Sequence, residues 1–101
     1  MEDVDELIHQ PLRLRIMATL TSLHPEVRVA VPDVRETFGV TDGNLGAHLR
    51  KLEDAGYIEV TKEFVQRKPR TFIRATDVGR ARFQRHINML RDLIDGIDGQ
   101  S

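Results

Sequence analysis

The sequence of 101 residues contains no cysteine and no tryptophan. Without cysteine the chain can form no disulfide, no thiolate metal site and no cysteine nucleophile. It also lacks an apolar run of the ~20 residues that a transmembrane helix requires. Its first residues, MEDVDELIH, are acidic, whereas a signal peptide begins with basic residues. We therefore expect a cytoplasmic protein that does not contact a membrane.

The overall composition is that of an ordinary globular domain, with 40% apolar and 31% charged residues. A chain of this length has room for one core, so we expect a single domain over residues 1–101. The net charge of −1 is not typical of nucleic-acid binders, but the charge is unevenly distributed. Residues 48–74 contain 7 Lys/Arg against 4 Asp/Glu, whereas residues 1–47 contain 4 against 8. The positive excess therefore lies in one segment, where it could contact phosphates.

Hydrophobic spacing predicts a first core helix that begins at Pro11. Leu12, Ile16 and Leu20 recur at helical spacing, and proline suits the first turn of a helix. A shorter helical turn is expected before it, over residues 4–8.

A helix-turn-helix pattern follows. After a short β-prone segment, one helix is predicted over residues 32–38 and a second over residues 42–55. Thr41 is a good N-cap for the second helix, and Gly56 suits the left-handed position that often follows a helix. Local signals therefore predict both ends of this helix.

A β-hairpin is predicted after the second helix. Residues 57–65 and 71–73 are rich in β-branched and aromatic residues. Between them lies a basic tip at residues 66–70, in which Pro69 fits a loop better than a strand interior. A final helix is predicted over residues 77–97. Its apolar residues step by 4, 3, 4 and 3, the spacing of a short heptad seam: Phe83, Ile87, Leu90, Ile94 and Ile97.

If its leucines face the core, the second helix presents one polar stripe to solvent. The stripe comprises Asn44, Ala47, His48 and Lys51. Asparagine can bond adenine, lysine can donate to guanine or phosphate, and alanine can touch a thymine methyl. Arg50 lies at the edge, where it could reach phosphate, but the ion pair with Asp54 at i+4 is the favoured role. The helix could therefore read bases in the DNA major groove.

Three further residues of this helix bear on DNA contact. Gly43 and Gly46 each cost roughly 1 kcal/mol relative to alanine. Close approach to a duplex would explain them, and so would simple tolerance of a short helix. Asp42 stabilises the helix N-terminus but would repel phosphate, so it must point away or accept from a cytosine amino group.

The basic hairpin tip suits contact with the DNA backbone or the minor groove. A solubilising loop is the alternative, but the position directly after a helix-turn-helix favours a role in binding. Arg74, near the strand end, is expected to pair with an acid. The expected DNA-contacting residues are Thr41, Asn44, Ala47, His48, Arg50, Lys51, Arg67, Lys68 and Arg70.

No catalytic or metal site is evident. The histidines are scattered and are predicted to lie on the surface: His9, His24, His48 and His86. None has a partner at metal-ligand spacing, and no phosphate loop or nucleophile–base set is present. We expect neither an enzyme nor a cofactor.

The runs TDGNLGAHLRKLEDAGYIEV, QRKPRTFIRAT and TDVGRARF resemble winged helix-turn-helix transcriptional regulators of the MarR-like and ArsR-like groups. The resemblance extends over about residues 7–95. It implies an α+β fold, mainly α with a small β-hairpin. The DNA-binding core would span about residues 7–76, and added terminal helices would mediate dimerisation, with the C-terminal one over about residues 77–97.

The resemblance further implies a homodimer, expected to be a repressor, on a roughly palindromic operator in double-stranded DNA. Helix 42–55 would enter the major groove and the wing, residues 66–70, would flank it. The implied dimerisation residues are Val4, Leu7, Ile8, Phe83, Ile87, Leu90, Ile94 and Ile97.

Two questions follow from the resemblance. It leaves open whether a small-molecule effector binds at the dimer cleft. The segment VPDVRETFG lacks the cysteine motif of ArsR-type metal sensors, which excludes metal sensing through that site. The alternative function is a winged helix used for protein–protein contact. That function would require exposed apolar residues on the second helix.

Overall fold

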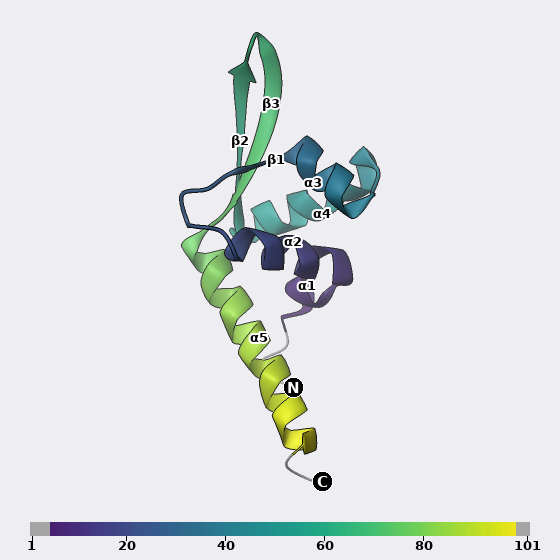
Figure 1. The fold of residues 1–101 in the computed structure, drawn as a ribbon, viewed down its shortest axis with the longest axis vertical. Coiled ribbons are helices and arrows are strands. Elements are labelled where there is room, and N and C mark those ends of the chain that lie inside the picture. Colours follow the sequence, from purple (N-terminus) through teal and green to yellow (C-terminus); the bar gives the residue numbers. More distant parts are fainter. Residues whose placement is uncertain (1–4, 99–101) are drawn as a thin grey trace.

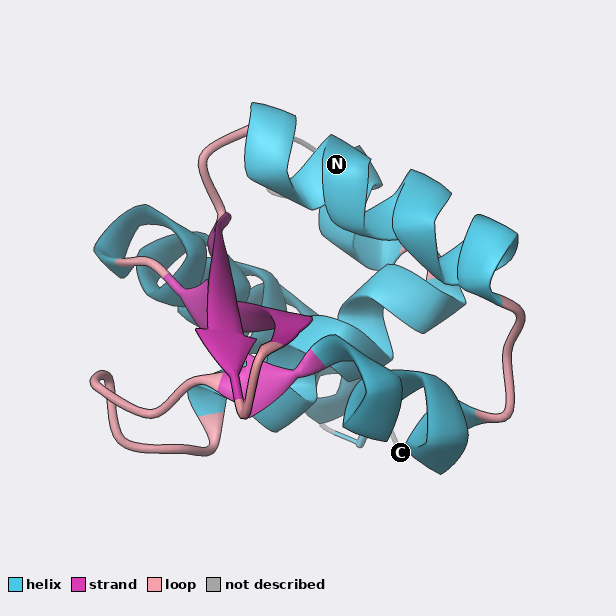
Figure 2. Ribbon diagram, turned by 90° about the horizontal axis from the view of Figure 1, so that it is seen from above, coloured by secondary structure: helices cyan, strands magenta, loops and turns pink. Residues whose placement is uncertain are grey.

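The computed structural model describes residues 5–98 and has the predicted mainly helical α+β architecture. Figure 1 shows the arrangement of the elements. In chain order these are α1 (Glu6–His9), α2 (Pro11–Thr21), β1 (Val29–Ala30), α3 (Val31–Phe38), α4 (Asp42–Asp54), β2 (Ile58–Val65), β3 (Lys68–Ala75) and α5 (Asp77–Asp98). The strands form one antiparallel sheet in the order β1-β3-β2. The view from above shows this small sheet with helices packed beside it (Figure 2).

The molecule is elongated. Its principal extents are 59 × 25 × 21 Å and its radius of gyration is 15.3 Å, whereas a compact chain of this length has a radius of about 13 Å. The β2–β3 hairpin projects from one end of the helical body and the C-terminal part of α5 from the other (Figure 1). Helices α3 and α4 lie on the hairpin side. The two projecting elements therefore offer separate surfaces.

The core lies between α2, α4 and the sheet. The predicted stripe of α2 is confirmed, since Leu12, Ile16 and Leu20 are all buried. They pack with Leu52 of α4 and Ile73 of β3, which are both 0% exposed. Burial of this apolar cluster fixes the inner face of α4, so that its opposite face must point outwards.

Both ends of α4 form as the local signals predicted. The Thr41 hydroxyl accepts a hydrogen bond from the Asn44 amide at 3.2 Å. At the other end Gly56 has a φ of +79°, a left-handed conformation that glycine adopts without steric cost. The Tyr57 amide then donates to the Leu52 carbonyl at 2.9 Å, which completes a Schellman motif.

The hairpin turn differs from the prediction. It consists of Gln66 and Arg67 alone, both with positive φ, whose twist matches that of the flanking strands. The expectation that Pro69 lies in a loop is wrong, because Pro69 pairs with Phe64 inside the ladder. In an antiparallel ladder this second pair after the turn is not hydrogen-bonded, so proline's missing N–H costs nothing there.

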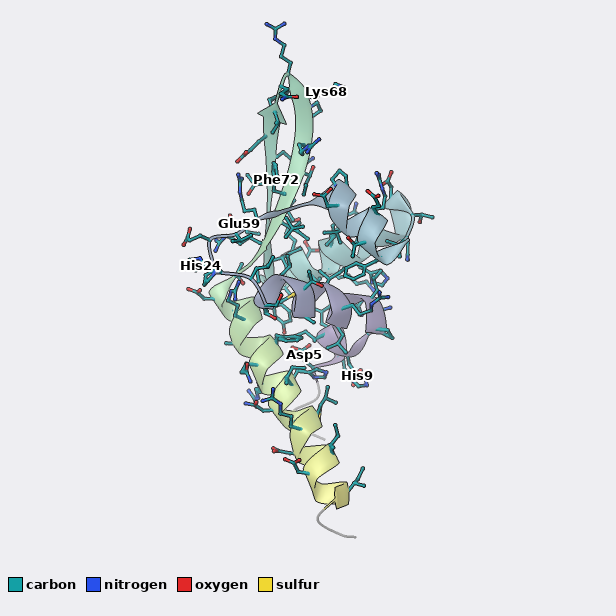
Figure 3. The ribbon with its side chains drawn as sticks, viewed as in Figure 1. Asp5, His9, His24, Glu59, Lys68 and Phe72 are labelled. Atoms are coloured by element: carbon teal, nitrogen blue, oxygen red, sulfur yellow. The ribbon has the colours of Figure 1, made fainter. Side chains whose placement is uncertain are left out.

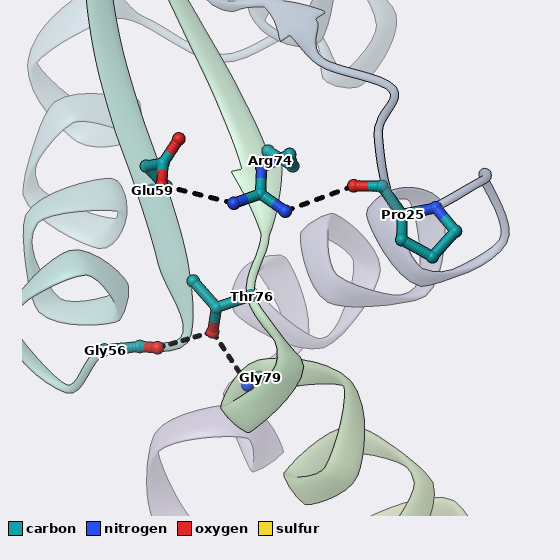
Figure 4. Close-up of polar contacts among 6 residues, drawn as sticks. All are labelled: Pro25, Gly56, Glu59, Arg74, Thr76 and Gly79. Atoms are coloured by element: carbon teal, nitrogen blue, oxygen red, sulfur yellow. Dashed lines mark hydrogen bonds and ion pairs between the residues drawn. The ribbon is translucent and has the colours of Figure 1, made fainter.

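The first turn of α5 packs directly on the segment that ends α4 (Figure 4). Thr76 caps α5, accepting from the Gly79 amide at 3.0 Å and donating to the Gly56 carbonyl at 2.6 Å. The Gly79 backbone lies so close that a Cβ at that position would stand 2.1 Å from the Tyr57 carbonyl oxygen. Only glycine fits here, which fixes α5 against the base of the hairpin.

A polar cluster joins the N-terminal segment to α5. The expectation that His86 lies on the surface is wrong, because it is 0% exposed. Its Nδ1 accepts from the Asp5 amide at 3.4 Å, and its Nε2 lies 3.5 Å from His9 Nδ1. The Asp5 carboxylate caps α1 and accepts from the Tyr57 hydroxyl at 2.6 Å. Figure 3 shows Asp5 and His9 beside α5.

These contacts shift the pKa values of two side chains, Tyr57 and His86. Burial, together with the hydrogen bond to Asp5, raises the pKa of Tyr57 to about 12. Burial, followed by the neighbouring His9, lowers the pKa of His86 below its ordinary value of 6.5. His86 is therefore neutral in the folded protein at pH 7.

The free energy of unfolding should fall as the pH drops below about 6.5. In that range the unfolded chain binds a proton at His86 more readily than the folded chain does, so protonation favours unfolding. His86→Asn should flatten this dependence, although half-buried His48, whose pKa is also lowered, retains part of it. Urea unfolding at a series of pH values between about 5 and about 8 measures the slope.

The control variant is His24→Asn, at an exposed position, which should keep the slope of the parent protein. An unchanged slope in His86→Asn would show that the buried imidazole does not control the acid sensitivity.

Candidate nucleic-acid interface

The outer face of α4 carries the predicted polar stripe. Asn44, Ala47 and Lys51 are exposed, as is the N-cap Thr41. Arg50 is exposed as well, and among residues 5–98 it forms no ion pair, so the expectation that it pairs with Asp54 is wrong. The face therefore combines an amide, a methyl group and two cations at helical spacing, which suits contact with base edges and phosphates.

His48 departs from the predicted stripe. It is half-buried, and its Nδ1 accepts from Nη1 of Arg13 in α2 at 2.9 Å. Arginine can only donate, so Nδ1 is the unprotonated nitrogen and Nε2 carries the hydrogen. Burial, then Arg13 and Lys51, lowers the pKa of His48, which keeps the ring neutral. Its main contact therefore positions α4 on α2, because only Nε2 remains available to an external acceptor.

The expected repulsion between Asp42 and phosphate is reduced by an ion pair within the protein. The Asp42 carboxylate accepts from Arg35 of α3 at 2.5 Å. The pair offsets the negative charge at the N-terminus of α4, and it also links the two helices of the helix-turn-helix. An exposed pair of this kind contributes little to stability, about 0–1 kcal/mol. For DNA binding, the more relevant effect of the pair is that it neutralises a negative charge on the surface of α4.

The glycines of α4 have no packing role inside the molecule. A Cβ built on Gly43 or on Gly46 would meet no atom within 4 Å. Both residues also have ordinary helical backbone conformations, since they are absent from the positive-φ glycines. Intramolecular contacts therefore do not account for two poor helix formers near the start of this exposed helix.

The hairpin tip is a cationic projection. Arg67, Lys68 and Arg70 are exposed, and Figure 3 places the labelled Lys68 at the far end of the hairpin. None of the three forms an ion pair with any residue between 5 and 98.

The acids of the hairpin, in contrast, are neutralised. Glu63 pairs with Arg28, whose hydrogen bonds lower the pKa of the Glu63 carboxyl. Glu59 pairs with Arg74 at 3.2 Å, as expected for that arginine, which also donates to the Pro25 carbonyl (Figure 4). The charge left unpaired on the hairpin is therefore positive.

Sequence reasoning missed two exposed residues of the hairpin. Lys62 is exposed, and Phe64 is 79% exposed near the tip. The sequence predicts that both residues lie in a strand, and it predicts no binding role for either. The period of two along β2 could have found them, since both share a face with Ile58 but lie beyond the reach of the core.

The predicted dimerisation residues differ in exposure. Ile8 is 0% exposed within the single chain, which corrects its assignment to a subunit interface. Leu7 packs against the core, and Val4 lies outside the described residues. On α5, Phe83 packs against the core and is half-buried, as are Ile87 and Leu90.

The far end of α5 is different. Leu93, Ile94 and Ile97 are 44%, 59% and 71% exposed. This apolar surface lies on the part of α5 that projects beyond the helical body (Figure 1).

A groove of about 360 Å³ lies between α2 and α5. Arg80 lines it, but its guanidinium donates to the carbonyls of Leu20, Thr21 and Leu23 and so caps the end of α2. Phe83 and Ile87 of the α5 seam line the same groove. The groove is therefore continuous with the apolar surface of α5.

Within residues 5–98, no three His, Asp or Glu side chains gather where they could hold a metal ion. No helix in that part of the chain is long and apolar enough to cross a membrane.

Comparison with known proteins identifies the family. The family model described as winged helix DNA-binding domain matches residues 12–94. An uncharacterized protein of Methanocaldococcus jannaschii is 30% identical over 93 residues, which are 92% of this chain and 98% of that protein. The solved structure of a transcriptional regulator homologue from Pyrococcus horikoshii is 31% identical with a TM-score of 0.85, covering 97% of this chain and 99% of the other.

A more distant structural neighbour is AbfR, solved bound to DNA. It is 16% identical, with a TM-score of 0.59, and the match covers 98% of this chain and 78% of AbfR. At that identity the likeness shows the fold alone. The family model and the two archaeal relatives together show that this chain belongs to the winged helix DNA-binding domain family, and its fold is that of a winged helix-turn-helix transcriptional regulator.

Proposed function

We propose that this DNA-binding regulator is a sequence-specific homodimeric repressor, working in the cytoplasm, with α4 in the major groove and the wing on the flanking DNA. The observation that carries the proposal is an exposed stripe on α4 beside a hairpin tip whose cations have no acidic partner among the described residues. The stripe comprises Asn44, Ala47 and Lys51, and the cations of the tip are Arg67, Lys68 and Arg70. Bases would be read by the stripe, and phosphates by the cations.

The roles within α4 follow from donor and acceptor chemistry. Asn44 would form two hydrogen bonds with adenine, and Lys51 would donate to guanine or to phosphate. Ala47 would contact a thymine methyl. Thr41 and Arg50, at the two edges, would contact the backbone. The Arg67–Arg70 wing would lie on the flanking backbone or in the minor groove.

DNA fits this surface better than a protein partner does. The exposed face of α4 contains no large apolar residue, since its only apolar side chain there is Ala47. Protein interfaces are built around buried aromatic and aliphatic residues, with few charges at their centre. A structural neighbour of the same fold, AbfR, has been solved on DNA, which further supports a duplex as the partner.

The homodimer is supported by the exposed end of α5. Helix α5 runs for 22 residues, about 33 Å at the α-helical rise. Its seam is half-buried at Phe83, Ile87 and Leu90 and exposed beyond them, with 59% exposure at Ile94 and 71% at Ile97. A second copy related by a twofold axis would cover this surface. The two α4 helices would then address half-sites about 34–36 Å apart on a palindromic operator.

Residues that contact DNA bases and residues that contact the DNA backbone should respond differently to substitution. Against a duplex selected from random-sequence DNA, Lys51→Ala should weaken binding of the selected site by about tenfold and change the base preference. Arg67→Ala should weaken all duplexes alike and lower the salt slope by about 1. Fluorescence anisotropy over a series of salt concentrations measures both.

For the parent dimer the logarithm of the affinity should fall with the logarithm of the salt concentration with a slope of about −5 to −7, if each subunit neutralises ~3–4 phosphates. The same loss at every sequence from both variants would mean that α4 does not read bases.

Close approach of α4 to DNA predicts opposite effects of one substitution on stability and on binding. Gly43→Ala should raise the free energy of unfolding by about 0.4–1 kcal/mol, because a Cβ there meets no atom of the protein. The same methyl group should lower affinity for the selected duplex by about tenfold, through collision with the groove. Gly96→Ala, equally free of contacts but on α5, is the control for affinity. If Gly43→Ala binds as tightly as the parent, the glycine is only tolerated.

The oligomeric state tests the role of α5. The double variant Ile94→Asp and Ile97→Asp should sediment as a monomer and bind the full operator at least about 100-fold more weakly, because two half-sites are no longer bound together. Asp95→Asn, an exposed position off the seam, should remain dimeric. If the double variant remains dimeric, the dimer interface does not lie at this end of α5.

A further inference from the structure

Phe64 is the most exposed of the large apolar side chains in the described part of the chain, at 79%. It lies one residue before the end of β2, at the tip of the projecting hairpin. Exposing an aromatic ring forfeits the stabilisation that its burial would give. Phe64 makes no aromatic or cation–π contact with any residue between 5 and 98, whereas the ring of Phe72 on the same hairpin is covered by Arg28, whose Cζ lies 4.7 Å from the ring centroid. Its exposure therefore points to a partner outside the chain.

The register gives Phe64 an apolar companion. It pairs with Pro69 across the antiparallel ladder, and paired residues project from the same face. Pro69 is exposed too. Two positions closer to the body, the same face carries Lys62 opposite Thr71. The tip therefore presents two neighbouring apolar rings with a lysine behind them.

Positive charge lies on both faces of the hairpin near this apolar pair. Lys62 shares the face of Phe64, whereas Lys68 and Arg70 project from the opposite face, where their cross-strand partners are Val65 and Glu63. Lys62, Arg67, Lys68 and Arg70 are exposed, and no carboxylate of residues 5–98 pairs with them. The nearest acid in sequence, Glu63, is held by Arg28. A suitable partner must then offer an apolar slot between negative charges. The minor groove of DNA has this chemistry, because sugar edges and bases lie between two rows of phosphates.

The position of the hairpin favours the groove beside α4. Strand β2 begins directly after the turn that ends α4, and the hairpin projects on the α3–α4 side of the body (Figure 1). A duplex lying along the exposed face of α4 would therefore pass the hairpin tip.

Resting on the proposed DNA-binding function, we propose that Phe64 and Pro69 form an apolar wedge that enters the minor groove and partly unstacks one base step. Lys62, on the same face as the wedge, and Arg67, in the turn beside it, would hold the neighbouring phosphates. Unstacking is easiest at flexible pyrimidine–purine steps. The wedge would therefore add a sequence preference at a position that no polar side chain reads.

The test uses duplexes selected from random-sequence DNA by the full-length protein, with 2-aminopurine placed at successive positions outside the α4 contact. Unstacking raises the fluorescence of this base. The parent protein should give an increase at one step in each flank. Phe64→Ala should abolish that increase and lower affinity by about tenfold. Val65→Ala removes an exposed apolar side chain from the opposite face and should leave the signal unchanged.

A second arm tests the preference itself. Replacing the flexible step by a rigid A-tract should weaken binding of the parent but not of Phe64→Ala. Arg67→Ala should lose affinity and salt dependence while keeping the fluorescence increase. If Phe64→Ala binds DNA with the parent's affinity and gives the same increase in fluorescence, the wedge proposal is wrong. The proposed DNA-binding function would not be affected by that result. If the parent binds no duplex, the proposed function itself fails.

A membrane surface is the other polyanion that accepts an aromatic ring among cations. Vesicles of phosphatidylcholine containing phosphatidylserine serve as the probe. Binding of the parent to these vesicles, lost in Phe64→Ala while duplex binding persists in both proteins, would overturn the wedge in favour of a lipid surface. Absence of vesicle binding, together with the fluorescence change on DNA, supports the wedge.

Discussion

The close packing of Gly79 on the Tyr57 carbonyl is the contact on which the geometry of the molecule depends. Tyr57 ends the Schellman motif of α4 and leads into β2, while Gly79 lies in the first turn of α5. Because a Cβ at position 79 would stand 2.1 Å from that oxygen, the two segments are in direct backbone contact. The Thr76 hydroxyl joins the same segments by bonds of 2.6 and 3.0 Å. The helix that would contact DNA, the hairpin and the helix that would contact a second copy therefore meet at one rigid junction.

A second constraint is electrostatic. Three acids near the proposed DNA surface form ion pairs with arginines. They are Asp42 of α4 and Glu59 and Glu63 of the hairpin. Exposed ion pairs of this kind add little to folding stability. They do remove negative potential from the region where phosphates would approach. A chain with a net charge of −1 can thus present a positive surface locally.

Much of the fold could be predicted because its signals are local. Thr41 and Gly56 mark the two ends of α4, and the spacing of its leucines sets which face is buried. These signals act over a few residues, so the exposed positions of Asn44 and Lys51 follow from them. The identity of the family followed from the same segment.

The misjudged residues depend on contacts between segments far apart in the sequence. His48 is turned towards Arg13, 35 positions earlier, and His86 is buried against the N-terminal segment, 81 positions away. Neither partner can be read from local spacing. The hairpin tip was misjudged for another reason. Gln66 and Arg67 adopt positive φ, which neither residue favours, so the sequence predicts a longer loop that includes Pro69.

The length of α5 has a mechanical consequence. The helix is held well beyond its first turn, because Phe83 packs against the core and His86 is buried against the N-terminal segment. Only the last turns, about 12 Å of helix over residues 91–98, extend past these contacts. A force applied at that end would therefore reach the end of α4 through the packing of Phe83 and His86 as well as through the junction at Gly79.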